Sequence, residues 1–164
     1  MRTLVYLSLG SNVGDRVGNL KTAVDQLEAL GRVTAVSSFY ETEPVEFTAQ
    51  PWFLNCAVAL KTDNTPQKLL AGILEIEKKM GRQRDGQQKG PRILDIDIVL
   101  FGDVVVATDG LTIPHPAMHQ RRFVLEPLAE IAPEAFHPVL KLTVRELRDA
   151  LPAGQAVRKK ATER

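Results

Sequence analysis

The stretch Arg92-Ile93-Leu94-Asp95-Ile96-Asp97-Ile98-Val99-Leu100-Phe101, preceded by Gly90-Pro91 and closed by Gly102, decides how this chain folds. Side chains alternate between the two faces of a β-strand. A strand over 92–101 therefore directs Asp95 and Asp97 to one face, about 6.6 Å apart along the chain. The other face is wholly aliphatic and suits a protein core: it carries Leu94, Ile96, Ile98 and Leu100.

The two carboxylates need compensation for their charge. Like charges at that separation repel, and burying them costs on the order of several kcal/mol if nothing neutralises them. Oxygen ligands with no Cys or His pair nearby favour magnesium, which usually works together with substrate phosphates. The alternative is an exposed edge strand with two solvated aspartates, but the apolar neighbours of Asp95 and Asp97 favour a central strand.

Composition limits the classes of protein to consider. The chain has 164 residues, 44% hydrophobic and 25% charged, which is typical of one globular domain over 1–164. A net charge of +1 gives no global attraction to nucleic acid or anionic membranes. The single cysteine, Cys56, excludes an internal disulfide and fits a reducing compartment. With neither a secretory signal nor a membrane span in the sequence, we expect a cytoplasmic protein.

Hydrophobic periodicity predicts the element order β-α-β-β-α-β, which is the ferredoxin-like or split βαβ order. The expected strands cover 3–9, 33–40, 53–61 and 92–101, with a polar loop over 41–51. One expected helix ends at Gly31, and another begins at Thr65-Pro66 and ends at Gly81. The fold class is therefore α+β, an antiparallel sheet with helices packed on it.

A C-terminal extension follows the aspartate strand. It contains expected short strands over 104–106 and 111–113, then a helical stretch over 115–131 that Pro116 and Pro127 interrupt. A capping box at Thr143-Val144-Arg145-Glu146 opens a last helix, which Pro152 ends. The polar tail from about residue 157 is expected to fray.

Arginines beside the aspartate strand indicate a polyphosphate ligand. Arg82 and Arg84 lie on or next to the glycine-containing loop 83–90, and Arg92 begins the strand. Arginine matches phosphate geometry bidentately, and phosphoryl transfer depends on positioning and charge neutralisation. The chain lacks a P-loop and a G-x-G-x-x-G motif, so nucleotide binding rests on metals and arginines. For any one arginine, the alternative is a solvated loop position.

Several motifs in register resemble one family, the 6-hydroxymethyl-7,8-dihydropterin pyrophosphokinases of folate biosynthesis. The stretch 90–102 closely resembles their signature, and the likeness extends from about Thr3 to Pro133. The other motifs are Leu9-Gly10-Ser11-Asn12, Ser37-Ser38-Phe39-Tyr40-Glu41-Thr42, Gln50-Pro51 through Phe53-Leu54-Asn55, Glu77 through Gly81-Arg82, and Ile113-Pro114-His115-Pro116.

The resemblance implies the reaction and its catalytic residues. The family transfers the β,γ-diphosphate of ATP to the hydroxymethyl group of the dihydropterin, and AMP is the other product. Asp95 and Asp97 would hold two magnesium ions, while Arg82 and Arg92 would contact phosphates and stabilise charge in the transition state.

The resemblance also implies the substrate contacts. A flat pterin suits an aromatic sandwich with hydrogen bonds along its edge. The implied pterin-binding residues are Thr42, Pro44, Val45, Phe53, Asn55 and Phe123. The implied ATP-binding residues are Glu77, Arg84, Ile98, Leu111, Thr112, His115 and Arg121. Core packing is the alternative for both phenylalanines, and a satisfied buried amide is the alternative for Asn55.

The chain departs from the family pattern at three positions. Lys89 replaces a common aromatic, Asp85 replaces a common basic residue, and Pro116 replaces a common tyrosine. The first two changes affect the loop, and the third removes a hydroxyl contact. None of them alters the carboxylate pair.

Two rival functions fit parts of the pattern. A two-metal nucleotidyltransferase also uses acidic residues on a sheet, but its Gly-Ser motif lies close before its D-x-D. An RNA-binding module of the RRM type shares the element order but needs aromatic platforms that are missing from the strands here. We therefore expect a monomer whose partners are ATP and the pterin, with no nucleic acid and no membrane.

Overall fold

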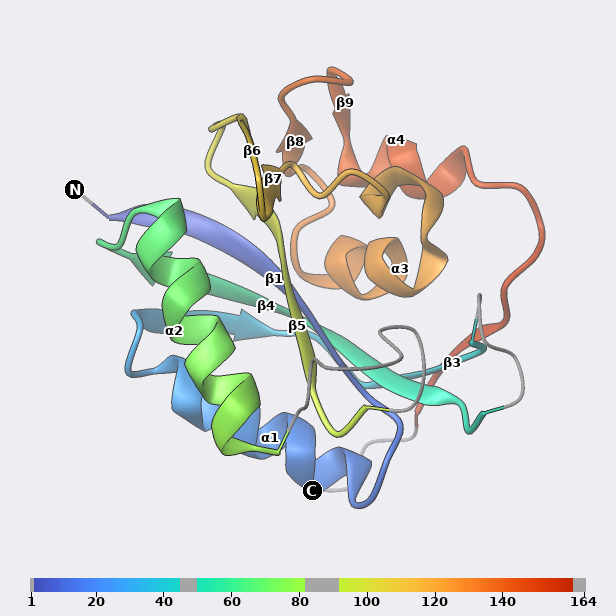
Figure 1. Ribbon diagram of the computed structural model, residues 1–164. Coiled ribbons are helices and arrows are strands. Elements are labelled where there is room, and N and C mark those ends of the chain that lie inside the picture. Colours follow the sequence, from blue (N-terminus) through green and yellow to red (C-terminus); the bar gives the residue numbers. More distant parts are fainter. Residues whose placement is uncertain (1, 45–49, 82–91, 161–164) are drawn as a thin grey trace.

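The structure is a computed structural model that describes residues 2–44, 50–81 and 92–160. An antiparallel sheet of six strands runs through the middle, with helices on both faces (Figure 1). Its strand order is β10-β3-β4-β1-β5, and β2 also pairs with β4. The strands are β1 (Thr3–Ser11), β2 (Arg32–Val36), β3 (Tyr40–Thr42), β4 (Phe53–Thr62), β5 (Asp95–Phe101) and β10 (Val157–Lys159).

The first face of the sheet is covered by α1 (Arg16–Leu27) and α2 (Pro66–Lys79). Alternate residues of β1 and β4 point into this core, which also takes in the apolar stripes of both helices. Thr65 caps α2 as predicted, with its side chain accepting a hydrogen bond from the backbone N–H of Lys68. The fully buried residues here include Leu7, Leu9, Leu20, Leu27, Leu54, Leu60, Leu69 and Ile73.

The second face is covered by α3 (Arg122–Ile131), against which α4 (Val144–Asp149) packs. A separate core lies here, and it includes Ala57, Val99, Met118, Leu125 and Leu128. The hairpins β6 (Val106–Thr108) with β7 (Leu111–Ile113) and β8 (Phe136–His137) with β9 (Leu142–Thr143), and the short 3₁₀ turn Met118–Gln120, connect the elements. Within the described ranges, no helix is long and apolar enough to cross a membrane.

A β-bulge corrects one prediction about the aspartate strand. Ile98 pairs with Leu7 and Leu100 pairs with Tyr6, so Val99 is an extra residue in β5. Val99 and Leu100 consequently both belong to the α3 core, and Phe101 returns to the α1–α2 core. The prediction that Leu100 shares a face with Ile96 is wrong because the alternation is reset at the bulge.

The predicted strand over 33–40 is two short strands. Between β2 and β3, Ser37 takes over the pairing with Ala57: its N–H donates to the Ala57 carbonyl at 2.9 Å, and its hydroxyl accepts from the Ala57 N–H at 2.8 Å. Both strands therefore pair along the same edge of β4, opposite β1. The predicted loop over 41–51 begins two residues later than expected, since Glu41 and Thr42 belong to β3.

Other boundaries also differ from the predictions. The helix expected to reach Gly31 ends at Leu27, and β5 begins at Asp95 rather than Arg92. The strand expected over 104–106 covers Val106–Thr108. Pro127 lies inside α3 and does not end it, and the segment expected to fray from 157 forms β10 against β3. The capping box at Thr143 and Glu146 is confirmed.

We predict that Ile73→Ala lowers the free energy of unfolding by about 2–5 kcal/mol, because Ile73 is fully buried between α2 and the sheet and its loss leaves a cavity. Leu74→Ala is the control on the same helix, since Leu74 is 37% exposed and its replacement costs much less. Urea unfolding of both variants measures the difference. Equal losses would contradict the assigned orientation of α2.

Candidate active site

The register of the sheet brings Asn55, a predicted pterin residue, onto the same face as the predicted metal ligands Asp95 and Asp97. Gly10 of β1 pairs with Asn55 of β4 on one side and with Asp95 of β5 on the other. Two residues earlier, Ser8 pairs with Ala57 and with Asp97. Because residues directly opposite in a sheet share a face, Asn55, Asp95 and Asp97 lie on the α3 side together with Ala57.

Gly10 is a point of close approach between β1 and the side chain of Asn55. A Cβ atom at this position would lie 2.6 Å from Nδ2 of Asn55 and 3.5 Å from the ring of Phe53. The first distance is too short for any side chain without displacement of Asn55. The close approach of Asn55 therefore requires a glycine at this position, between Asn55 and Asp95.

The carboxylate pair is accompanied by a cation from its own segment. Nη1 of Arg92 lies 3.0 Å from Oδ2 of Asp95, and both side chains are mostly buried, at 17% and 22% exposure. Among the described residues, no cluster of three or more His, Cys, Asp or Glu side chains could hold a metal ion. A metal at Asp95 and Asp97 would therefore take its further ligands from elsewhere, and magnesium commonly takes them from phosphates and water.

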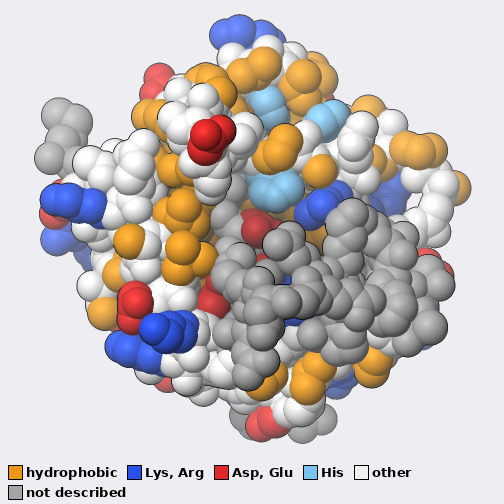
Figure 2. All heavy atoms as spheres, viewed as in Figure 1, with side chains coloured by type: hydrophobic (Ala, Val, Ile, Leu, Met, Phe, Trp, Pro, Cys, Tyr) orange, Lys and Arg blue, Asp and Glu red, His pale blue; other side chains and the backbone are white. Residues whose placement is uncertain are grey.

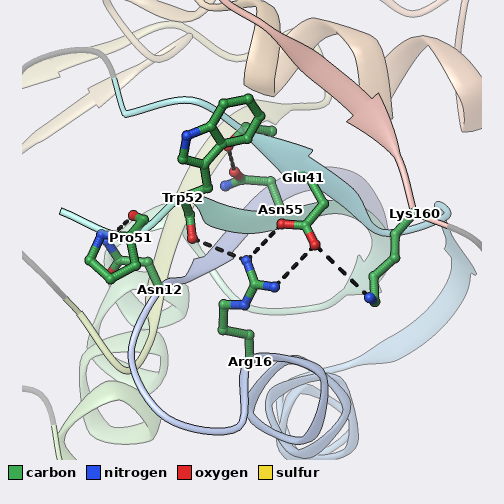
Figure 3. A network of polar contacts seen from close by, with 8 residues as sticks. Asn12, Arg16, Glu41, Pro51, Trp52, Asn55 and Lys160 are labelled. Carbon is green, nitrogen blue, oxygen red and sulfur yellow. Dashed lines mark hydrogen bonds and ion pairs between the residues drawn. The ribbon is translucent and has the colours of Figure 1, made fainter. Parts of the chain in front are cut away.

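Asn12, which directly follows β1, connects the segments that lead into β4 and β5. Its Nδ2 donates to Oε1 of Gln50 at 2.8 Å. The same Nδ2 donates to the carbonyl of Pro51 at 3.1 Å, as Figure 3 shows. Its Oδ1 accepts from the N–H of Arg92 at 2.7 Å, and its own N–H donates to the Arg92 carbonyl at 3.0 Å. With only 2% of Asn12 exposed, this side chain fixes both segments relative to β1.

Glu77 of α2 stabilises β5 between the two aspartates. Its side chain is 1% exposed, and its Oε2 accepts a hydrogen bond of 2.8 Å from the N–H of Ile96. The prediction that the aspartate strand is central is wrong, because β5 ends the strand order of the sheet. The Glu77 carboxylate therefore satisfies a backbone donor that no further strand of the described residues pairs with. Its predicted contact with ATP remains a prediction.

His115 lies near Asp95 and Arg121 and is neutral at physiological pH. The pKa of His115 is lowered to about 4, chiefly by burial and also by the charge of Arg121, while the charge of Asp95 opposes the shift. Nδ1 accepts a hydrogen bond of 3.1 Å from the N–H of Ala117, which places the single ring proton on Nε2. On the face of the molecule shown in Figure 2, histidine, acidic and basic side chains lie next to one another.

Two of the predicted pterin residues, Asn55 and Thr42, lie on the β4 side of Gly10, away from Asp95. Oδ1 of Asn55 accepts a hydrogen bond from the hydroxyl of Thr42, and Nδ2 donates to the Leu9 carbonyl at 3.3 Å. The amide is thus engaged within the sheet, while retaining capacity for one further bond at each end. Phe123 is half-buried against the α3 core, and the guanidinium of Arg121 lies 5.4 Å from the centre of its ring.

The remaining predicted site residues, and the positions that depart from the family pattern, lie at several different places. Ile98 and Leu111 pack against the α1–α2 core, and Thr112 is exposed on β7. Pro116 follows His115 just before the 3₁₀ turn. Val45, Arg82, Arg84, Asp85 and Lys89 lie outside the described residues.

Two polar connections were not foreseen from the sequence. One is Asn12, which stands inside a noted motif but whose partners are 38 to 80 residues away. The other is Arg16 of α1, which donates to both oxygens of Glu41 at 2.8 and 3.0 Å and to the Trp52 carbonyl at 3.1 Å (Figure 3). The Arg16 bonds lower the pKa of Glu41 and tie β3 to the start of β4.

Comparison with known proteins identifies a family whose model covers the part of the chain that contains these residues. The family model of 7,8-dihydro-6-hydroxymethylpterin-pyrophosphokinase (HPPK) matches residues 6–133, which include every predicted site residue. This chain belongs to the HPPK family. A Bacillus subtilis 2-amino-4-hydroxy-6-hydroxymethyldihydropteridine pyrophosphokinase is 47% identical to it over 133 residues, covering 80% of this chain and 79% of the relative.

Other HPPK relatives are longer polypeptides. The Dictyostelium discoideum folic acid synthesis protein FOL1 is 41% identical over 151 residues, covering 92% of this chain but only 23% of that protein. The crystal structure of Plasmodium falciparum HPPK-DHPS wild type with pterin and p-hydroxybenzoate shares the fold, with a TM-score of 0.73 at 22% identity over 91% of this chain and 43% of that chain. The comparisons support neither rival function, nucleotidyl transfer nor RNA binding.

We predict that Asn12→Ala lowers the free energy of unfolding by about 1–3 kcal/mol, because it leaves buried partners on both neighbouring segments unsatisfied. Hydrogen exchange at the Arg92 amide should accelerate. Asn12→Asp is the matched control, since it keeps the acceptor for that amide and removes only the donors. Unchanged exchange in the alanine variant would disprove the connection.

We predict that His115 titrates near pH 4 in the folded protein, against 6.5 in the unfolded chain. As the pH falls, the unfolded chain takes up this proton first, so the stability that His115 contributes is complete above about 6.5 and is lost towards about 4. NMR titration of the imidazole measures the midpoint. The unfolding free energy of His115→Gln should change less over this pH range, and a midpoint at or above 6.5 would be inconsistent with the burial described.

Proposed function

We propose that this chain transfers the β,γ-diphosphate of ATP to the hydroxymethyl group of 6-hydroxymethyl-7,8-dihydropterin in folate biosynthesis. The observation that carries this proposal is the row Asn55–Gly10–Asp95 across β4, β1 and β5, in a chain of the HPPK family. Neighbouring strands are about 4.8 Å apart, so the backbones of Asn55 and Asp95 are separated by about 10 Å. A bicyclic ring with a one-carbon arm can bridge that span.

Asp95 and Asp97 would hold magnesium, two ions in this proposal. The donor set fits, because it consists of carboxylate oxygens on one face of a strand and leaves the other positions to phosphates and water. Magnesium at this place would neutralise charge on the triphosphate and lower the pKa of the attacking hydroxyl.

The pterin end of the row would orient the acceptor. Phe53 and Phe123 are proposed to lie against the two faces of the ring, where aromatic stacking contributes beyond simple burial. Asn55 and the backbone of Thr42 to Val45 would bind the pterin edge, since an amide offers both a donor and an acceptor. The Thr42–Asn55 bond would hold the amide in the orientation that presents both.

The nucleotide would lie along the outer side of β5. His115 offers its Nε2 proton to a phosphate oxygen, and its lowered pKa keeps this donor neutral at physiological pH. Arg121 would add a cation there. Leu111 and Thr112 of β7, with the backbone of Ile98, would face the adenine, and Glu77 would take part through the strand that it supports.

Arg92 lies where its guanidinium could stabilise negative charge in the transition state. Its guanidinium already contacts Asp95, and its further donors can bind a phosphate oxygen at the same time. In the reaction, the pterin hydroxyl oxygen bonds to the β-phosphorus as its proton leaves, and the bond from the β-phosphorus to the bridging oxygen of AMP breaks. Arg92, with Arg82, would stabilise the charge that builds on that oxygen, and Arg84 would bind ATP.

The elements from β1 to β5 are proposed to form a ferredoxin-like core. Its support is the strand order β5-β1-β4-β2 with α1 and α2 on a single face. In this view α3, α4 and the hairpins are a C-terminal extension that covers the other face and encloses the site. We also propose that the chain acts as a monomer on these two small molecules.

The test is to incubate the protein with ATP, magnesium and the hydroxymethyldihydropterin and to measure AMP. We predict pterin-dependent AMP formation, and a loss of at least about a hundredfold in Asp97→Asn, because the variant removes one of the two charges that hold the cation. Asp103→Asn is the control, since Asp103 is exposed in the turn after β5.

Each alternative gives a different product pattern. Release of diphosphate instead of AMP would indicate nucleotidyl transfer. AMP formation without pterin, or full activity in a folded Asp97→Asn variant, would refute the proposal.

A further inference from the structure

The segment 155–160 lies outside residues 6–133, which the HPPK family model matches, yet it contacts the proposed pterin site. After α4 the chain returns to the sheet and forms β10, which pairs with β3 through Val157–Thr42, Arg158–Glu41 and Lys159–Tyr40. We call residues 155–160 the C-terminal strap. Because of the strap, β3 is paired on both sides although it has only three residues.

The strap holds Glu43, which lies between the proposed pterin residues Thr42 and Pro44. The N–H of Glu43 donates to the Ala156 carbonyl at 3.0 Å, and the N–H of Ala156 donates to Oε1 of Glu43 at 3.1 Å. The side-chain amide of Gln155 also donates to the Glu43 carbonyl. Backbone and side chain of Glu43 are thus both fixed by the strap.

The same glutamine reaches the other wall of the site. Oε1 of Gln155 accepts a hydrogen bond of 3.3 Å from the N–H of Phe123, at the start of α3. The neighbouring Arg122 donates to the carbonyl of Pro152 at 3.1 Å, just before the strap. One side chain therefore bridges the β3 end, which carries the pterin edge contacts, and α3, which carries an aromatic face.

The far end of the strap holds the start of β4. The guanidinium of Arg158 lies 5.1 Å from the ring centre of Trp52, next to the proposed pterin residue Phe53. Nζ of Lys160 is 3.9 Å from Oε2 of Glu41, which is also bound by Arg16 (Figure 3). Both ends of the connection between β3 and β4 are consequently attached to the strap.

We propose that the C-terminal strap positions the pterin site, and that Gln155 sets the spacing between Phe123 and the Thr42–Pro44 backbone. This inference rests on the proposed function. A flat ring held between an aromatic face and a backbone edge needs both walls at a fixed separation, and fixing them before binding lowers the entropic cost of binding. Gln155 is a positioning residue, because it acts through Glu43 and Phe123.

Loss of the strap contacts should therefore weaken the affinity for the pterin and leave the affinity for the nucleotide nearly unchanged. Asp95, Asp97 and His115 belong to β5 and the segment after β7, whereas the strap contacts are to β3, α3 and the start of β4. Arg121 adjoins one strap contact through the ring of Phe123, but Gln155 bonds to the Phe123 backbone. Loss of the Gln155 bridge should raise the Kd and KM for the pterin while the Kd for ATP and kcat at saturation stay nearly constant.

The experiment compares the full chain with Gln155→Ala. Binding of 6-hydroxymethylpterin and of a non-hydrolysable ATP analogue with magnesium is measured by calorimetry, and steady-state AMP formation gives KM and kcat. We expect a rise of about tenfold in the Kd for the pterin, the equivalent of one lost hydrogen bond, and a change of less than about twofold for the ATP analogue. Hydrogen exchange at the Phe123 amide should also accelerate.

Controls separate positioning from general destabilisation. Gln26→Ala replaces an exposed glutamine of α1 and should change neither affinity. Gln155→Glu keeps an acceptor for Phe123 but loses the donor to Glu43, so its pterin affinity should also fall. If Gln155→Ala does not fold, Arg158→Ala tests the same selective loss through Trp52.

The outcomes are decisive. Wild-type affinity for pterin in Gln155→Ala, or parallel losses for pterin and nucleotide, would overturn the positioning role while leaving the proposed function intact. If the wild-type chain itself fails to bind the pterin, the proposed function fails, and this inference fails with it.

Discussion

The hydrogen-bonded register of β1 between β4 and β5 is the constraint on which the other features depend. Because Gly10 is opposite both Asn55 and Asp95, a slip of one residue on either side would turn a polar group into the α1–α2 core. The two cores oppose such a slip, since Val5, Leu7 and Leu9 of β1 are fully buried against α1 and α2. Burial on one face thereby fixes the chemistry on the other.

Polar side chains then determine where the ends of the strands lie. Asn12 attaches the segments before β4 and β5 to the end of β1, and Glu77 satisfies the outer edge of β5 between the two aspartates. Arg16 and the C-terminal strap do the same for β3. These groups come from distant parts of the chain, so the site of this HPPK-family protein is assembled by the fold as a whole.

Local patterns in the sequence predicted the elements well where one physical effect dominates. The alternation around Asp95 and Asp97, the N-cap at Thr65 and the capping box at Thr143 are all found. The bulge at Val99 was missed because an extra residue in an apolar run leaves no compositional trace. The partners of Asn12 and Gln155 were missed because long-range hydrogen bonds depend on topology, not on spacing.

The bulge at Val99 divides β5 into two lengths that have different neighbours. Before the bulge, each residue of β5 pairs directly with one residue of β1, and this regular pairing fixes the direction of the two carboxylates. After it, Leu100 contributes to the α3 core and Phe101 to the α1–α2 core, in a register of their own. Substitutions after the bulge can thus be accommodated without changing the direction of the Asp95 and Asp97 side chains. Tolerance to substitution should therefore differ sharply between the two parts of β5.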